Sequence, residues 1–210
     1  MPLLQTIKTG NISIAVWEMT ESGDELCRLI ALTKSDQCVM EKLTVERREK
    51  EFLTVRILLS GLMDCYPEIG HDSHRKPFLV NSKLNLSISH SRVLAAVILS
   101  DNPVGIDTEE TTRSVAKIAP RFLTEDELLW TSESDDPGKA QLFCWSCKEA
   151  VFKIMGIPGL DFRVNMQVSP TELEPEGITY VKFRSTDSCV YIPVNYFFWK
   201  NNVVTWCTGK

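Results

Sequence analysis

The chain has 210 residues, with 23 lysines and arginines against 28 aspartates and glutamates, a formal net charge of -5 and a hydrophobic content of 43%. These values are typical of a globular protein with one large or two small domains, and they exclude a disordered or fibrous chain. The acidic balance argues against a nucleic-acid binder, because phosphate backbones attract a basic contact surface.

Residue patterns in the first half predict a small sheet with helices. In the longest predicted helix, the apolar residues Phe52, Val55, Leu59 and Leu62 follow a spacing that marks one buried stripe. The continuous apolar run at 94–99 predicts a central strand. In chain order we expect strands at 12–17, 76–80, 84–89 and 94–99, a helix that begins near residue 22, and a helix from 44 to 62.

A turn at residues 101–103, Asp-Asn-Pro, divides the chain into the halves 1–101 and 102–210. Gly156 predicts the end of a long helix, and Asn201-Asn202 predicts a hairpin between the last two strands. The second half is expected to contain strands at 104–108, 162–168, 178–183, 190–199 and 203–206, and helices at 124–130 and 139–155. Both halves mix helices with a small sheet, so we expect an α+β protein of two similar halves.

The cysteines, the longest apolar run and the start of the chain indicate the compartment. Seven scattered cysteines, an odd number, predict reduced thiols in a cytoplasmic protein rather than a disulfide framework. The longest apolar run, at 93–99, is too short to span a bilayer, and the start of the chain does not resemble a secretory signal. We therefore expect no membrane partner.

Two further patterns could suggest a metal or redox site. Cys144 and Cys147 form a C-x-x-C pattern, but it lies in the middle of a predicted helix and has no second copy, which favours a structural role. His71 and His74 lie near Cys65 in a polar stretch without a fourth ligand, which favours a solvated loop over a zinc site.

Two carboxylates share one face of the predicted strand at 104–108. Side chains alternate along a strand, so Gly105, Asp107 and Glu109 point to the same side. Neighbouring carboxylates on one face repel each other unless a cation or water lies between them. Gly105 on that face leaves room for a ligand to approach. The alternative is a frayed strand end, where solvent screens the repulsion.

A second acidic position lies on the helix at 139–155. Trp145, Glu149 and Lys153 recur at intervals of four residues, on the side opposite the apolar stripe. Because Trp145 and Phe152 are large aromatic residues on or near this side, we expect Glu149 and Lys153 to face a cleft. The alternative is an ordinary exposed Glu–Lys pair, which contributes about 0.2–0.5 kcal/mol.

Three carboxylates on two elements, without clustered histidine or cysteine, favour a hard cation such as Mg²⁺, which prefers oxygen ligands and often bridges carboxylates to phosphate. A neighbouring lysine suits charge that develops on a phosphate. The residues themselves therefore predict Mg²⁺-dependent chemistry on a phosphoanhydride or phosphodiester, and they leave the substrate open.

The chain contains several motifs of one enzyme family in the family's order. Trp145, Lys148, Glu149 and Lys153 match W-x-x-K-E-x-x-x-K. The companion motif G-[IV]-D-x-E is matched upstream by Gly105, Ile106, Asp107 and Glu109.

Weaker matches surround these two motifs. Residues 87–91 match S-x-S-H-S, and Arg121-Phe122 with Glu127 match R-F-x-x-x-x-E. Lys76-Pro77 resembles the end of a G-K-P element in which Arg75 replaces the glycine, a position that suits a positive φ. Arg75 could alternatively add positive charge to the same pocket. Together the motifs resemble those of the 4′-phosphopantetheinyl transferase superfamily.

The resemblance implies a reaction and a fold. The phosphopantetheine arm of coenzyme A would be transferred to a serine hydroxyl of an apo acyl or peptidyl carrier protein, with release of adenosine 3′,5′-bisphosphate. The length of the chain points to the long single-chain (Sfp-type) class. In that class two similar α+β halves form a pseudo-dimer within a monomer, with the active site in the cleft between them.

The resemblance also implies roles for individual residues. Asp107, Glu109 and Glu149 would be ligands of Mg²⁺, which would bind the pyrophosphate of coenzyme A. Glu149 would accept the serine proton, directly or through water. Lys153 would stabilise charge on the phosphate or leaving group. Lys148 is a further candidate for phosphate contact, with a surface lysine as the alternative.

On the N-terminal side, Ser89 and His90 would contact a phosphate of coenzyme A; a half-buried structural histidine is the alternative for His90. Lys76 and Arg56 are weaker candidates for binding the adenine nucleotide. Glu127 either organises the site or caps its helix.

Two other functions remain as alternatives. One is another Mg²⁺-dependent phosphotransferase or phosphodiesterase that uses the same carboxylates. The other is a catalytically silent carrier-protein-binding module on the same fold. An inactive relative is expected to lack an acidic ligand or Lys153, and this chain retains them all, which favours the transferase.

Overall fold

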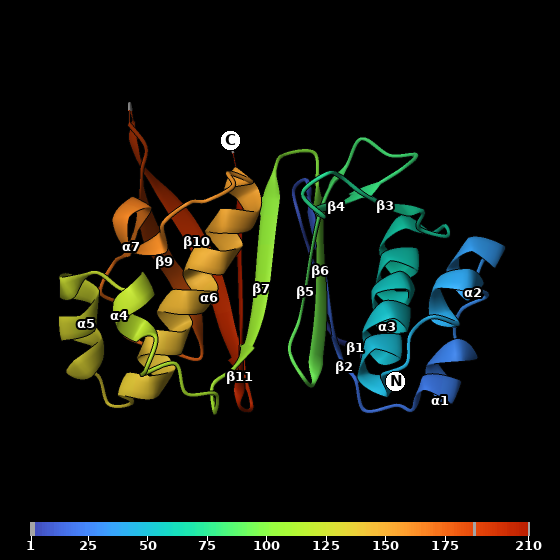
Figure 1. Cartoon of the computed structure of the whole chain (residues 1–210), viewed down its shortest axis with the longest axis horizontal. Coiled ribbons are helices and arrows are strands. Elements are labelled where there is room, and N and C mark those ends of the chain that lie inside the picture. The colour runs from blue at the N-terminus through green and yellow to red at the C-terminus, as the bar shows by residue number, and fades with distance from the viewer. Residues whose placement is uncertain (1–2, 187, 210) are drawn as a thin grey trace. The chain divides into compact units, whose positions relative to one another are not determined.

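The computed structural model of the chain describes residues 3–186 and 188–209. The chain forms two compact units, Met1–Asp101 and Asn102–Lys210. In each unit, helices accompany an antiparallel sheet (Figure 1). The predicted α+β class is therefore confirmed.

The first unit is built on a four-stranded sheet of order β1-β2-β6-β5, with all neighbours antiparallel. Its long helix α3 packs on β2 and β6, and its core includes Leu53 and Leu59 of α3 with Ala15 and Val97 of the sheet. The elements are β1 (Leu3–Thr9), β2 (Ile12–Glu18), α1 (Gly23–Cys27), α2 (Lys34–Met40), α3 (Glu46–Met63), β3 (Ile69–His71), β4 (Pro77–Leu79), β5 (Asn85–His90) and β6 (Leu94–Ser100).

The predicted strand at 94–99 is central as expected, since β6 pairs with both β2 and β5. The predicted strand at 76–80 is only the short β4, which forms a separate two-stranded sheet with β3. Three elements of this unit were not predicted: the edge strand β1, the short strand β3, and the short helix α2, which begins after the N-cap Thr33.

The second unit is built on a five-stranded antiparallel sheet of order β7-β11-β10-β9-β8. The long helix α6 packs across β7, β11 and β10, and Phe143, Cys147 and Ala150 on its buried side belong to the core. The elements are β7 (Val104–Glu110), α4 (Ala119–Phe122), α5 (Glu125–Ser132), α6 (Pro137–Met155), α7 (Phe162–Asn165), β8 (Met166–Val168), β9 (Glu176–Arg184), β10 (Cys189–Trp199) and β11 (Asn202–Thr208).

Local capping explains where the helices of the second unit begin and end. Helix α6 follows an Asp136 side chain that accepts the Lys139 backbone N–H, and it ends at Gly156 with a φ of 60°, as predicted. The predicted hairpin also forms, with the turn one residue earlier than expected because Asn202 already begins β11.

The predicted strand at 162–168 is wrong in its first half. Asp161 accepts hydrogen bonds from the backbone N–H groups of Arg163 and Val164, so residues Phe162–Asn165 form the short helix α7. Only Met166–Val168 continue as a strand. A side-chain cap thus outweighs the β-prone composition of this segment.

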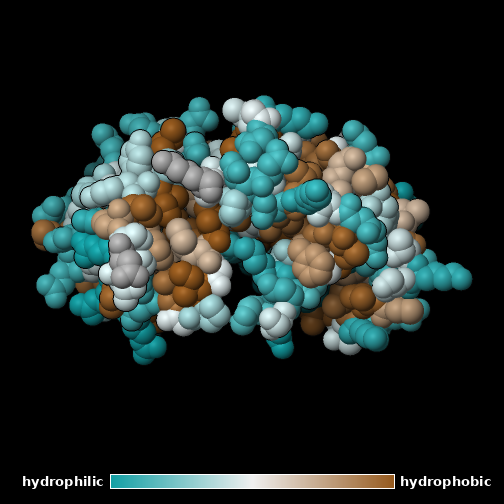
Figure 2. Space-filling model, turned by 90° about the horizontal axis from the view of Figure 1, so that it is seen from above, coloured by the Kyte–Doolittle hydropathy of each residue, from teal (hydrophilic) through white to brown (hydrophobic). Residues whose placement is uncertain are grey.

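Two features bear on whether the chain spans a membrane: the distribution of apolar residues on the surface and the length of the helices. Hydrophilic and hydrophobic residues are interspersed on the face seen in Figure 2. No helix within residues 3–186 and 188–209 is long and apolar enough to cross a membrane.

Candidate active site

The contact between β7 and α6 depends on Gly105. A Cβ atom at this position would lie 1.9 Å from the carbonyl oxygen of Ala150 and 3.3 Å from the Cβ of Lys153. The room that the glycine provides is therefore filled by the backbone of α6. The expectation that it leaves space for a ligand is wrong, and its role is to bring the helix close to the strand.

Asp107 is buried between these two elements, with 5% of its surface exposed. The Lys153 Nζ donates to Asp107 Oδ1 at 2.9 Å and to the Ile106 carbonyl oxygen at 2.6 Å. The Ser146 hydroxyl donates to Asp107 Oδ2 at 2.9 Å. The strand continues to Glu110 in register with β11, so the alternative of a frayed strand end is excluded.

Glu109 lies on the same face and is half-buried. Its Oε1 accepts the indole N–H of Trp145 at 2.9 Å and pairs with Arg113 Nη2 at 3.1 Å. Burial raises the pKa of this carboxyl, and the negative charge of Asp107 raises it further. The repulsion between the two carboxylates is therefore reduced by two cations of the protein, Lys153 at Asp107 and Arg113 at Glu109.

Glu149 completes the acidic group. It is half-buried, and within the described residues its carboxylate has no hydrogen bond or ion pair. Burial raises the pKa of Glu149 to about 7, with a further contribution from the charges of Asp107 and Glu109. The electrostatic potential at the Glu149 carboxylate is therefore negative, and the positive charge of Lys153 offsets it only in part.

The donor chemistry of this group fits a hard cation. Three carboxylates face two protein cations, Lys153 and Arg113, which leaves one negative charge at Glu149 uncompensated. Oxygen donors with excess negative charge are what Mg²⁺ prefers. Within the described chain, however, no group of three or more histidine, cysteine, aspartate or glutamate residues is already arranged to hold a metal ion. Metal binding at this group therefore stays a prediction.

Lys148 occupies a different place from the one predicted. Its side chain is fully buried, and its Nζ donates to Glu127 Oε2 at 2.7 Å. Burial lowers the pKa of Lys148, and the Glu127 carboxylate opposes that shift. Both predicted roles, phosphate contact and surface lysine, are wrong, because the ammonium has no exposed side from which to reach a ligand.

Glu127 serves two purposes at once. Its Oε2 accepts the backbone N–H of Thr124 in a capping box that begins α5, and the same oxygen accepts the Lys148 ammonium. Its Oε1 accepts the backbone N–H of Val168 in β8. The predicted helix cap is thus confirmed, and a role of Glu127 in organising the site stays a prediction.

In the first unit, Arg56 is largely engaged by its own surroundings. Its Nη2 pairs with Asp36 Oδ1 at 2.6 Å, and its guanidinium carbon lies 3.3 Å from the centroid of the Phe52 ring. The hydroxyl of Tyr66 donates to the same aspartate. Arg56 lines a cavity of about 550 Å³ that His90 also lines.

Ser89 and His90 point to opposite faces of β5, because successive strand residues alternate. Ser89 is buried, whereas the half-buried His90 lies on the side of α3 with its Nδ1 3.4 Å from Glu51 Oε1. Burial lowers the pKa of His90, so the ring is neutral at neutral pH. A phosphate would therefore meet a hydrogen-bonding imidazole there rather than a cation.

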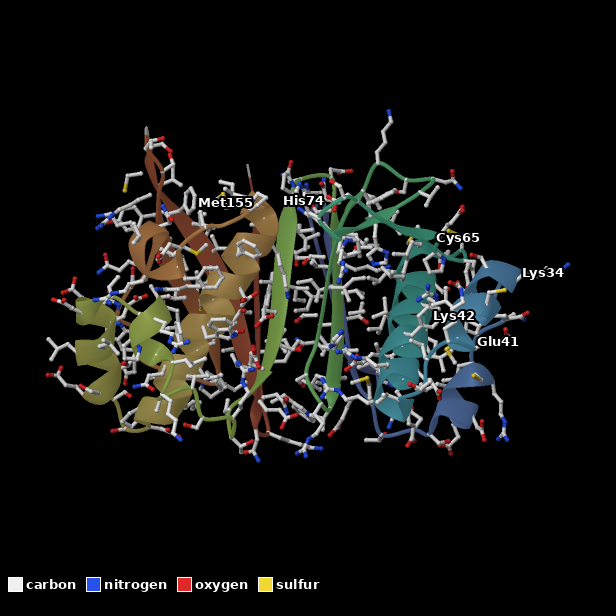
Figure 3. The ribbon with its side chains drawn as sticks, in the orientation of Figure 1. Lys34, Glu41, Lys42, Cys65, His74 and Met155 are labelled. Carbon is white, nitrogen blue, oxygen red and sulfur yellow. The ribbon has the colours of Figure 1, made fainter. Side chains whose placement is uncertain are left out.

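Lys76 and Arg75 lie in the exposed loop before β4. Arg75 has a φ of 63°, the left-handed conformation that the glycine of the matched motif suits and that a non-glycine residue adopts at some cost. The backbone N–H of Lys76 donates to Asp72 Oδ1 at 2.9 Å. Cys65 and His74 are exposed and lie apart from each other (Figure 3), whereas His71 ends the short strand β3.

The two cysteines of the C-x-x-C pattern are structural. Cys144 and Cys147 are fully buried in α6 as free thiols. Burial raises the pKa of both thiols well above the ordinary value, which keeps them protonated and unreactive.

Three residues of the site were missed in the sequence. Ser146 lies one turn before Glu149 on α6, a spacing that could have revealed it. Arg113 follows Glu109 by four residues but lies beyond the strand. Thr205, whose hydroxyl is 2.9 Å from that of Ser146, comes from β11 opposite Asp107, and only the pairing of the strands brings it there.

Known proteins resemble the chain in the region of this site. A family model described as the 4′-phosphopantetheinyl transferase superfamily matches residues 103–207, half of the chain. That segment contains the whole acidic group, with Lys148 and Lys153.

Individual relatives match over different lengths. The chain is 32% identical over 87 residues to the 4′-phosphopantetheinyl transferase gsp of Aneurinibacillus migulanus, covering 40% of this chain and 36% of that protein. It is 27% identical over 165 residues to the 4′-phosphopantetheinyl transferase HetI of Nostoc sp., covering 70% of this chain and 69% of that protein. The chain thus spans little more than a third of the Aneurinibacillus relative. The crystal structure of Thermotoga maritima holo-[acyl-carrier-protein] synthase matches with a TM-score of 0.41 and 24% identity, over 50% of this chain and 61% of that one.

Proposed function

This chain belongs to the 4′-phosphopantetheinyl transferase superfamily, and we propose that it transfers 4′-phosphopantetheine from coenzyme A to a serine of an apo carrier protein. The family membership agrees with the resemblance found in the motifs. The donor, the acceptor and the metal requirement are proposals for this chain.

The observation that carries the proposal is the acidic group of Asp107, Glu109 and Glu149 beside Lys153. These side chains lie on β7 and α6, within the segment that the family model matches. A lysine next to carboxylates is suited to phosphoryl transfer, where most of the catalysis comes from positioning and charge stabilisation.

In the proposed reaction, the serine oxygen forms a bond to the phosphorus that carries the pantetheine arm. The bond from this phosphorus to the bridging oxygen of the pyrophosphate breaks, and adenosine 3′,5′-bisphosphate leaves. The serine proton passes to the Glu149 carboxylate, directly or through one water. The pKa of about 7 belongs to the metal-free chain, and binding of Mg²⁺ to the same carboxylate would lower this pKa and weaken the base.

Asp107, Glu109 and Glu149 are the residues that would hold Mg²⁺. When bound, the ion supplies charge neutralisation on the pyrophosphate. Lys153 holds Asp107 in place through the contact at 2.9 Å and offers its ammonium to phosphate oxygens. Ser146 fixes the other Asp107 oxygen, so the carboxylate has a defined orientation before substrate arrives.

We propose that the nucleotide end of coenzyme A binds to residues of the first unit. Lys76, exposed in its loop, and His90 and Ser89 at the end of β5 are the candidates that the resemblance implies. Arg56 is the weakest of them, because Asp36 already holds its guanidinium.

The partner would be an acidic acyl or peptidyl carrier protein. We place the chain in the long single-chain (Sfp-type) class and propose that it acts as a cytoplasmic monomer. The free state of all seven cysteines supports a reducing compartment.

The test is to incubate the chain with coenzyme A, Mg²⁺ and a panel of apo carrier proteins and to measure intact carrier masses. We expect a phosphopantetheine mass gain on at least one carrier, release of adenosine 3′,5′-bisphosphate, and loss of both with excess EDTA. A carrier whose acceptor serine is replaced by alanine is the control.

A mass gain that persists in EDTA would contradict the metal assignment. Binding to a carrier without any mass gain would favour a catalytically silent carrier-binding module.

A further inference from the structure

Lys148 is the centre of a buried set of hydrogen bonds. Besides its contact with Glu127, its Nζ donates to the carbonyl oxygens of Phe122 at 2.7 Å, Met166 at 3.0 Å and Phe162 at 3.2 Å. These acceptors belong to α4, to β8 and to α7, whereas the lysine belongs to α6. One ammonium therefore joins α4 and the continuous stretch of α7 and β8 to the helix that carries Glu149.

Two of these acceptors belong to residues that pack against Trp145. The Phe122 ring meets the indole edge to face, with 5.0 Å between centroids, and the Phe162 ring lies at 5.6 Å from it. The Trp145 indole N–H donates to Glu109. A continuous set of contacts thus leads from the buried lysine, through the two phenylalanines, to a carboxylate of the acidic group.

We propose that Lys148 is a positioning residue, which fixes Phe122 and Phe162 around Trp145 so that the indole N–H holds Glu109 in place. Its effect on transfer rests on the proposed function; its effect on Trp145 does not.

The buried ammonium of Lys148 indicates that its hydrogen bonds have a role besides stabilising the fold. A buried ion pair is weak evidence for stability, since apolar residues of similar volume often stabilise as well. Methionine at 148 would fill most of the space but would donate to none of the three carbonyl oxygens. It would also leave Glu127 buried without its cation, which is strongly destabilising.

The direct test follows the Trp145 indole N–H by ¹H–¹⁵N NMR of the full chain. Its signal among the five tryptophans is assigned by its absence in Trp145→Phe. We expect Lys148→Met to shift this signal or to speed its hydrogen exchange. Lys148→Gln, which retains the two N–H donors of its amide group, should lie in between. Lys139→Met is the matched control on the same helix, because the ammonium of Lys139 lies over the Phe198 ring. The Trp145 indole signal of this variant should equal that of the wild type.

The kinetic test separates positioning from phosphate contact. Lys148→Met should lower kcat by about tenfold to a hundredfold, as expected for a small misplacement of catalytic groups, with KM for coenzyme A nearly unchanged. A raised KM with an unchanged kcat would instead indicate direct contact with coenzyme A and overturn the proposal. An unshifted Trp145 signal with unchanged hydrogen exchange in folded Lys148→Met would overturn it as well.

If Lys148→Met does not fold, the same measurements are made on Lys148→Gln. If the wild-type chain modifies no carrier, the proposed function fails, whereas the NMR comparison still decides the positioning role.

Discussion

Glu149 differs from its two acidic neighbours because, within the described residues, no hydrogen-bond donor or cation pairs with its carboxylate. Asp107 accepts from Lys153 and Ser146, and Glu109 accepts from Trp145 and Arg113. Glu149 has a pKa near 7 because burial and the two other carboxylates disfavour its charged form. A chain selected for stability alone has no use for such a group, which supports a role for Glu149 in binding and chemistry.

This charge predicts a pH dependence of stability in the metal-free protein. The folded-state pKa of about 7 lies above the ordinary value of 4.5. The folded state therefore binds the proton more tightly, and stability falls as pH rises from about 4.5 to 7. Glu149→Gln should remove this loss. In EDTA at pH 8 we expect the variant to melt at a higher temperature than the wild type, by about 2–4 °C for each kcal/mol gained in the free energy of unfolding. At pH 4.5 the two proteins should melt at the same temperature.

Thermal unfolding followed by circular dichroism checks this prediction, with Glu176→Gln at an exposed position as control. A difference that is the same at both pH values would show that the carboxyl of Glu149 does not titrate in this window.

Sequence alone locates the acidic group but not its supporting contacts. Asp107, Glu109 and Glu149 follow from strand alternation and helix period, which are local properties of the chain. The burial of Lys148 depends on where α4, α7 and β8 are placed, and no local pattern encodes that placement. The same holds for Thr205, which reaches Ser146 only through the pairing of β11 with β7.

At the scale of elements, the distance between β7 and α6 determines the site. Two carboxylates come from the strand and one from the helix, so any change in their spacing changes the group as a whole. Gly105 sets that spacing, because a side chain there would meet the helix backbone at Ala150. Helix backbone is stiff and cannot move aside as a flexible side chain can.

Gly105→Ala should therefore destabilise the fold and impair the site together. We expect a loss of about 1–3 kcal/mol, the usual effect of overpacking, measured by urea unfolding. Gly61→Ala is the matched control, since it lies in α3 with nothing within 4 Å of an added Cβ, and it should stabilise by about 0.4–1 kcal/mol. Equal stability of Gly105→Ala and wild type would refute the close-packing role of Gly105.

Short elements were the least predictable from sequence. Helix α7 depends on one aspartate cap in a β-prone stretch, and α2 depends on one threonine cap. The long helices α3 and α6 were predicted, because their apolar residues recur over several turns.

At the scale of the whole chain, the two units follow a common plan, each a long helix on an antiparallel sheet (Figure 1). The strands were predicted mostly from composition, whereas the pairing of β2 with β6 and of β7 with β11 joins residues far apart in sequence. Such pairing depends on tertiary contacts that no short segment specifies.

The most direct test of the account compares wild type with Glu149→Gln in the carrier-mass assay, with coenzyme A and Mg²⁺ at neutral pH. We predict that the wild type adds phosphopantetheine to a carrier, and that the variant, although at least as stable, does so at least about a hundredfold more slowly. Equal rates for the two proteins, or no mass gain by the wild type on any carrier, would contradict the account.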